Sequence, residues 1–387
     1  MQELMFLGLF VLALAIGWFL GRREAIKVGF MLQPHGSAVD KQYFIGLNYL
    51  LNEQPDEAIE TFIRALEVNP ETVETHIAIG KLFCQRGDVE RAIKVHQNLL
   101  ARPNLTPEQG DRVQLELARD YLAVGMHQRA ERLLEELAGS GSSLRAEALV
   151  DLVAAYEHQH EWREAIAVGE RLLRERADFS VTLAQYHCEL AARAVQRREV
   201  AEAQLHLRTA LKVEPLCVRA LIMSAELQVQ GGDYKAAARL LQRLAEQAPD
   251  FVPEVLALAE RCADNGALDL TAYLDQALER ATKPVVSVVL ARTRQIQREQ
   301  GAASAERFLL QRLQMQPSLS GVHELLRLRG PASSETDPLP ELLEALVRAR
   351  PRYRCDSCGF TGNKLYWQCP SCQSWSTVKP LKGHELS

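Results

Sequence analysis

The order of hydrophobic and polar residues divides the chain into stretches of different character. Residues 4–20 form an uncharged apolar run, which predicts a helix about 25 Å long, at the short end of what spans a bilayer. From residue 39 to residue 330, apolar positions recur at helical spacing among charges of both signs, which predicts a succession of amphipathic helices. After residue 351 the chain changes to a short segment rich in aromatic residues and cysteines.

The helical stretch repeats itself with a period near 34 residues, starting with the unit at residues 43–70. Small residues such as Gly46 stand where two antiparallel helices approach closely, aromatic residues fill the remaining gaps, and Pro70 stops the second helix. The small residue at position 20 recurs at steps of 34, 38, 35, 38, 34, 34 and 34 residues, as Ala58, Ala92, Ala130, Ala165, Ala203, Ala237, Thr271 and Ala305. This spacing resembles the tetratricopeptide repeat.

The predicted fold is therefore all-α, with six clear and two weak repeat units over residues 39–330. One helical hairpin cannot bury its apolar face alone, so the copies must stack. The resemblance to tetratricopeptide proteins implies a superhelix whose groove binds peptides or protein segments. The sequence holds no GxxxxGK[ST], HExxH or GxSxG motif, which favours a binding protein over an enzyme. A net charge of -5 with mixed signs does not favour nucleic acid as a partner.

The N-terminal apolar run is interpreted as a membrane anchor rather than a cleaved signal or a buried helix. Met1, Gln2 and Glu3 precede it without positive charge, and no small-residue cleavage site follows it. Arg22 and Arg23 come directly after it, so the positive-inside rule places the rest of the chain in the cytoplasm. We expect a single-pass anchor over residues 1–21, a linker over residues 22–38, and reduced thiols beyond them.

Residues 331–350 are expected to form a hinge and one amphipathic helix, and residues 351–380 a separate small domain. This domain carries two CxxC turns, formed by Cys355, Cys358, Cys369 and Cys372. Two such turns aim four thiolates at one point and predict one tetrahedral metal ion. Four thiolates leave no position for water, which argues against hydrolysis. Zinc is favoured, and iron in the same cage, as in rubredoxin, stays open.

Two other groups of side chains need an interpretation. The remaining cysteines have no metal-like spacing and are expected to be small core residues, namely Cys84, Cys188, Cys217 and Cys262. Arginines enter the metal module at alternate positions, as Arg348, Arg350, Arg352 and Arg354. They offset thiolate charge, contact an acidic partner, or bind phosphates of lipid or nucleic acid, and the sequence leaves these three roles open.

Taken together, the anchor, the repeats and the segment PRYRCDSCGFTGNKLYWQCPSCQSWST at residues 351–377 resemble the lipopolysaccharide assembly protein B family of Gram-negative bacteria. The resemblance covers essentially the whole chain. It implies an inner-membrane protein that restrains lipopolysaccharide synthesis by acting with the membrane-bound AAA+ protease FtsH to promote degradation of the deacetylase LpxC. It also implies a rubredoxin-like module packed against the repeats, with the four clustered cysteines as its metal ligands.

The mechanism that follows is that of an adaptor, in which the anchor confines the protein near the protease and the groove holds the client. One alternative is a scaffold that gathers lipopolysaccharide synthesis or transport proteins without affecting proteolysis. A second alternative is a redox module, which requires iron in the cysteine cage. The oligomeric state is left open by the sequence.

Overall fold

The computed structural model describes residues 73–103, 105–281, 283, 285–330, 344–346 and 350–381, with the single positions 45, 48, 49, 61 and 342. The chain divides into two compact units, Met1–Arg145 and Ala146–Ser387. The predicted anchor, the linker and most of the first repeat lie outside the described residues. Within the described part of the chain, no helix is long and apolar enough to cross a membrane.

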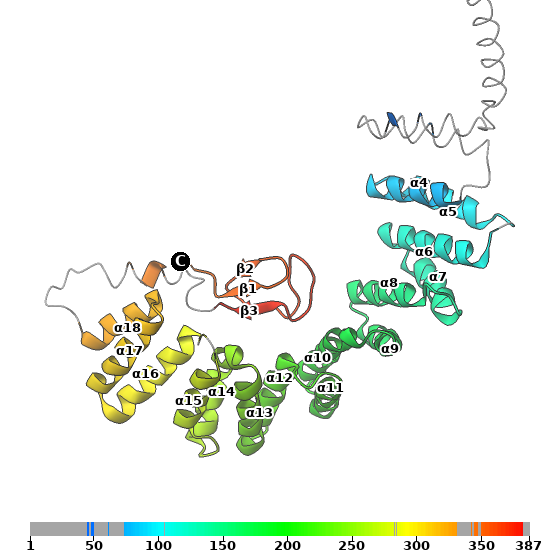
Figure 1. The fold of residues 1–387 in the computed structure, drawn as a ribbon. Helices are drawn as coiled ribbons and strands as arrows, with labels where there is room; N and C mark the ends of the chain where they lie inside the picture. The colour runs from blue at the N-terminus through cyan, green and yellow to red at the C-terminus, as the bar shows by residue number, and fades with distance from the viewer. Residues whose placement is uncertain are drawn as a thin grey trace, which may run out of the picture. The chain divides into compact units, whose positions relative to one another are not determined.

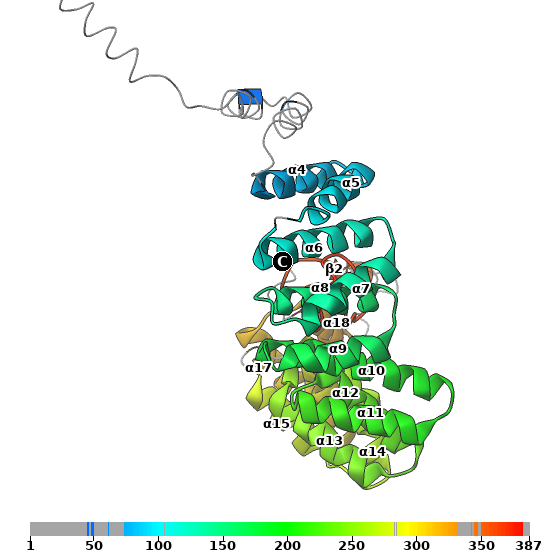
Figure 2. The same cartoon turned by 90° about the vertical axis from the view of Figure 1, so that its right-hand side faces the viewer.

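The described part of the first unit contains two helical hairpins, in which α4 contacts α5 and α6 contacts α7 (Figure 2). The helices are α4 (Val73–Gln85), α5 (Val89–Leu100), α6 (Pro107–Ala123) and α7 (His127–Gly139). The start of α6 is fixed by Thr106, whose side chain accepts from the Gln109 amide while the Gln109 side chain accepts from the Thr106 amide. This reciprocal cap satisfies two backbone donors at the start of α6.

Close helix approach in the first unit depends on a glycine at the position where the repeat requires a small residue. Gly80 of α4 lies under the imidazole of His96 on α5, and a Cβ placed on Gly80 would lie 2.3 Å from His96 Nε2. His96 is fully buried, and its Nδ1 lies 2.5 Å from Asp120 Oδ2 on α6. The glycine therefore lets a buried polar pair join three helices.

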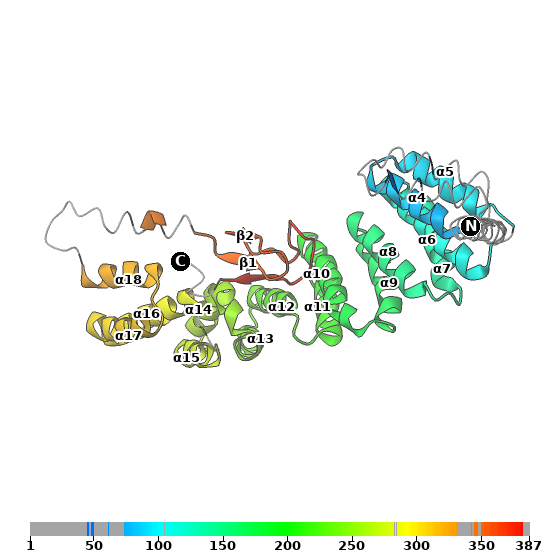
Figure 3. The same cartoon turned by 45° about the horizontal axis from the view of Figure 1, so that its top comes forward.

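The second unit continues the hairpins and ends in a small sheet. Its helical elements are α8 (Arg145–His158), α9 (Trp162–Leu173), η1 (Ala177–Phe179), α10 (Ser180–Gln196), α11 (Val200–Val213), α12 (Val218–Gln230), α13 (Tyr234–Gln247), η2 (Pro249–Val255), α14 (Leu256–Asp264), α15 (Leu270–Arg280), α16 (Val286–Gln300), α17 (Ala302–Met315) and α18 (Leu319–Arg329). The helices α10, α12 and α14 follow one side of the unit, and α11, α13 and α15 follow the other (Figures 1 and 3).

Burial agrees with the predicted register at six of the position-20 residues. The position-20 alanines are fully buried at Ala92, Ala130, Ala165, Ala203, Ala237 and Ala305. Thr271 departs from this pattern, because it lies in the first turn of α15, where Asp269 caps the helix, and is only half-buried. The regular helices are also interrupted by η2, a seven-residue 3-10 helix with Pro253 inside it. Proline has no N–H to donate, so the usual helical ladder is interrupted there.

The C-terminal segment forms the ribbon, a name used here for residues 350–381. Strands β1 (Tyr353–Cys355), β2 (Thr361–Gly362) and β3 (Val378–Pro380) form an antiparallel sheet in the order β2-β1-β3. Tyr353 pairs with Gly362 on one side and with Pro380 on the other. The ribbon lies beside α10, α12 and α14 (Figures 1 and 3). The described structure is thus an α-helical repeat protein with a small ribbon.

We predict that Gly80→Ala lowers the free energy of unfolding by about 1–3 kcal/mol, because the added methyl group must displace the enclosed His96 ring. Gly110→Ala in α6 is the matched control, since nothing lies within 4 Å of its added Cβ. It should be neutral or stabilising by about 0.5–1 kcal/mol. Urea unfolding followed by far-UV circular dichroism measures both, and equal midpoints for the two variants would contradict the close-packing argument.

Candidate metal centre and its contacts with the repeats

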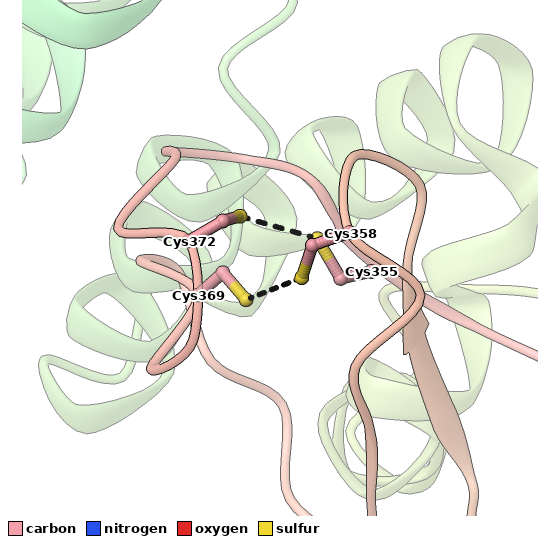
Figure 4. Close-up of side chains that lie close together, drawn as sticks. All are labelled: Cys355, Cys358, Cys369 and Cys372. Atoms are coloured by element: carbon pink, nitrogen blue, oxygen red, sulfur yellow. Dashed lines mark hydrogen bonds between the residues drawn. The ribbon is translucent and has the colours of Figure 1, made fainter. Parts of the chain in front are cut away.

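The four clustered cysteines meet at one point of the ribbon. Their sulfur atoms all lie within 4.8 Å of one another. The Sγ atoms of Cys355 and Cys372 are 3.7 Å apart, as are those of Cys358 and Cys369 (Figure 4). Zinc–sulfur bonds of about 2.3 Å in a tetrahedron separate the sulfurs by about 3.8 Å. The donor set therefore fits one tetrahedral metal ion, as the sequence predicted.

Each CxxC turn is held by backbone hydrogen bonds. In the first turn the Cys355 amide donates to Phe360 O at 2.7 Å, and Gly359 adopts a φ of 77°. In the second turn the Cys369 amide donates to Ser374 O at 2.9 Å, and Gln373 adopts a φ of 59°. The left-handed residue follows the last cysteine of each turn, which turns the chain back over the sulfurs.

The environment makes the four thiols unequal before any metal binds. Hydrogen bonds from the Ser374 side chain and amide lower the pKa of Cys372 to about 6. Burial raises the pKa of Cys369 to about 11. Metal binding requires all four thiolates, so it must displace the protons that remain.

One face of the ribbon contacts the repeats through the carboxylate of Glu157 at the end of α8. Trp375 Nε1 donates to Glu157 Oε1 at 3.0 Å, and Gln368 Nε2 donates to the same oxygen. The Tyr186 hydroxyl of α10 donates to the other oxygen. Burial, together with the Glu157 charge, raises the pKa of Tyr186 far above its ordinary value, so the phenol stays a donor.

Aromatic rings surround this carboxylate. The Trp375 ring is edge-on to Trp162 of α9 at 6.2 Å and to Tyr186 at 6.0 Å. Next to them, Gln185 Nε2 donates to Ser376 Oγ at 2.9 Å. Aromatic pairs at such distances add stabilisation beyond the apolar area that they bury. The segment after Cys372 is therefore anchored to three helices.

A second contact joins the ribbon to η2. The Tyr353 hydroxyl donates to Glu254 Oε1 at 2.6 Å, and the Trp367 ring stacks on Phe251 with 6.2 Å between centroids. Leu365 and Trp367 pack against the hydrophobic core of the repeats. Burial, followed by the hydrogen bond to Glu254, raises the pKa of Tyr353 above its ordinary value. The ribbon thus completes its small core with side chains of the repeats.

Comparison with known proteins places these features in one family. A rubredoxin metal binding domain model matches residues 353–380, and tetratricopeptide repeat models match residues 45–103, 115–178 and 194–262. Lipopolysaccharide assembly protein B of Escherichia coli K12 is 34% identical over 392 residues, covering 99% of each chain. The chain belongs to the lipopolysaccharide assembly protein B family. The Haemophilus influenzae Rd member is 31% identical over 403 residues, covering 100% of each chain.

Solved structures of other proteins match part of this chain. A crystal structure of MamA protein is 19% identical and covers 46% of this chain and 93% of its own, with a TM-score of 0.36. The expectation drawn from lipopolysaccharide assembly protein B, that the ribbon packs against the repeats, is confirmed by the contacts of Glu157 and Glu254.

The other predicted side chains have separate positions in this member of the lipopolysaccharide assembly protein B family. Cys188, Cys217 and Cys262 are buried among helices, as expected of core residues, and Cys84 is half-buried. Arg352 lies over the Tyr353 ring at 5.9 Å, and Arg354 is exposed beside the first CxxC turn. Arg348 lies outside the described residues.

The acceptors that hold the ribbon in place carry no distinctive signal in the sequence. Glu157 and Glu254 were not singled out, because a lone carboxylate in a helical segment has the same appearance as exposed surface charge. The aromatic residues of the ribbon were the available signal, since a segment of about thirty residues cannot bury that many rings by itself.

We predict that Cys355→Ser abolishes stoichiometric metal binding and unfolds the ribbon, because three thiolates no longer close the site. Elemental analysis should fall from one metal per chain to well below one, and the near-UV circular dichroism of the ribbon tryptophans should collapse. Cys84→Ser, in the first unit, is the control and should keep one metal. A Cys355→Ser protein with full metal content would refute the assignment of this ligand.

We also predict that Glu157→Ala weakens the attachment of the ribbon by about 1–3 kcal/mol, because the donors of Trp375, Gln368 and Tyr186 lose their acceptor. Hydrogen exchange should rise in residues 367–376 while the metal content stays unchanged. Glu164→Ala removes an exposed carboxylate from α9 and should leave exchange at the wild-type rate. Unaltered exchange in Glu157→Ala would show that the aromatic contacts suffice.

Proposed function

We propose that this protein is an inner-membrane adaptor that promotes FtsH-dependent proteolysis of the deacetylase LpxC and so restrains lipopolysaccharide synthesis. The observation that carries the proposal is the match to lipopolysaccharide assembly protein B over 99% of both chains, which includes the apolar N-terminus, the repeats and the ribbon. Stacked helical hairpins offer extended surfaces for protein segments, which suits an adaptor without chemistry of its own.

The proposed parts have distinct tasks. Residues 1–21 form the anchor and residues 22–38 the linker, with the bulk of the chain on the cytoplasmic side. Confinement to the membrane raises the effective concentration of the adaptor near a membrane-bound protease. The repeats over residues 39–330 bind the client, and the hinge and helix at residues 331–350 lead to the metal-binding domain at residues 351–380.

The ribbon is proposed to hold one metal ion through Cys355, Cys358, Cys369 and Cys372. A tetrathiolate-bound ion supplies a structural cross-link and offers no open coordination position. Zinc suits this task because it has no redox chemistry. Iron would give the aerobically purified protein a red colour and would revive the redox alternative, whereas a colourless protein with one zinc per chain excludes it.

A scaffold for lipopolysaccharide synthesis proteins is the second candidate, and it is supported by the word "assembly" in the name of the relatives. Two experiments distinguish the candidates. Depletion of an adaptor changes the half-life of LpxC, whereas depletion of a scaffold leaves that half-life unchanged. For a scaffold, crosslinking of the anchored protein recovers synthesis enzymes without a protease.

We predict that deletion of residues 1–21 lengthens the half-life of LpxC towards that of depleted cells, because the adaptor is no longer concentrated beside the protease. The truncated protein should keep its helicity and metal content. Replacement of residues 4–20 by an unrelated transmembrane helix is the control and should restore turnover. Normal turnover by the truncated protein, measured after protein synthesis is stopped, would contradict tethering.

A further inference from the structure

A pocket lies at the junction between the ribbon and the repeats. Its volume is about 240 Å³, and its lining comes from η2, α16 and the start of α18 on one side and from residues 350–353, 380 and 381 on the other. Its apolar walls include Val286, Leu290 and Leu319 from the repeats, with Tyr353 and Leu381 from the ribbon. Neither part forms this pocket alone.

The size of the pocket limits what it holds. Sites for drug-sized molecules and cofactors usually range from about 300 to 1,000 Å³. A volume near 240 Å³ is below that range and suits one or two large side chains of a bound segment. The neighbouring face of α8, α10 and η2 is already covered by the ribbon through the contacts of Glu157, Gln185 and Glu254. The junction pocket lies beside these contacts and is open to a bound segment.

The charge at the rim of the pocket selects the kind of segment. Arg350 is half-buried and Arg352 is exposed, and both line the pocket. Among the described residues, neither guanidinium forms an ion pair. Among the lining residues that the structure describes, Glu254 is the one carboxylate, and it already accepts a hydrogen bond from the Tyr353 hydroxyl. Two arginines against one engaged carboxylate leave excess positive charge in a chain whose net charge is -5.

We propose that this pocket binds an extended acidic segment of the client, with one apolar side chain inserted between α16 and the ribbon and adjacent carboxylates paired with Arg350 and Arg352. Arginine forks suit carboxylates because they donate two parallel hydrogen bonds. The inference rests on the proposed function, and it assigns the client-binding residues that the function requires.

The shared construction of the pocket links the metal to the client. Loss of the ion unfolds the ribbon and removes Tyr353, Leu381 and both arginines from their places. The repeats then keep only half of the lining. The metal acts on client binding through the shape of this pocket, without touching the client.

The test is direct binding of purified, labelled LpxC to the metal-loaded full chain in detergent. Arg350→Glu with Arg352→Glu should raise the dissociation constant about tenfold or more and make binding less sensitive to salt concentration. Ser287→Trp should raise the dissociation constant to a similar extent with both arginines intact, because the indole fills the pocket from the start of α16. Arg280→Glu with Arg298→Glu makes the same change in net charge at exposed positions on α15 and α16 and should stay within about twofold of wild type.

The outcomes separate the pocket from the proposed function. Metal content and thermal stability are measured first, so that a folding defect is not counted as a binding defect. If the wild type binds LpxC and the pocket variants bind it equally well, the pocket assignment is wrong and the adaptor stands. If the wild type does not bind LpxC and its depletion leaves the half-life of LpxC unchanged, the adaptor is wrong and the pocket assignment falls with it.

Discussion

The indole of Trp375 donates to Glu157 while its ring lies against Trp162 and Tyr186. The ribbon depends on such contacts between its own side chains and those of the repeats. Its own buried cluster is small, consisting of Tyr353, Cys355, Cys369 and Val378. So few side chains do not offset the loss of conformational entropy of about thirty residues. The metal cross-link supplies one part of the missing stabilisation, and the surface of the repeats supplies the other.

This dependence explains how the second unit is built around the ribbon. The contacts reach α8, α9 and α10 at one end and η2 at the other. The 3-10 helix η2 interrupts the regular hairpins, and its Phe251 and Glu254 are the residues that meet Trp367 and Tyr353. The element that departs from the regular hairpins is therefore one of the places where the repeats contact the ribbon.

Local geometry could be predicted from the sequence because it repeats or is closed by nearby residues. Gly80 occupies the small position of its repeat, and the fully buried Ala92 and Ala305 follow the period. The two CxxC turns bring four sulfurs together through short-range hydrogen bonds, so their spacing alone predicted the site. The helix boundaries around η2 could not be predicted from the sequence. Where the repeat residues depart from the usual pattern, the sequence does not reveal that a 3-10 helix replaces a helical turn.

The contacts between distant parts of the chain could not be predicted, because no periodicity connects them. Glu157 is 218 residues from Trp375, and Glu254 is 99 residues from Tyr353. The aromatic residues of the ribbon are a signal that it packs on a partner surface, but a single sequence gives no pairing between those rings and particular helices. The pocket beside Arg350 and Arg352 was out of reach for the same reason.

The bonds from the ribbon to α8 and to η2 also have a mechanical consequence. A stack of helical hairpins behaves as a spring, because each hairpin touches mainly its neighbours and small rotations add up along the stack. A rigid element fastened to hairpins at both ends of a segment opposes those rotations. The ribbon therefore restrains relative rotation of the hairpins between α8 and η2. Removal of the metal would release this restraint and leave the segment as flexible as other repeat arrays.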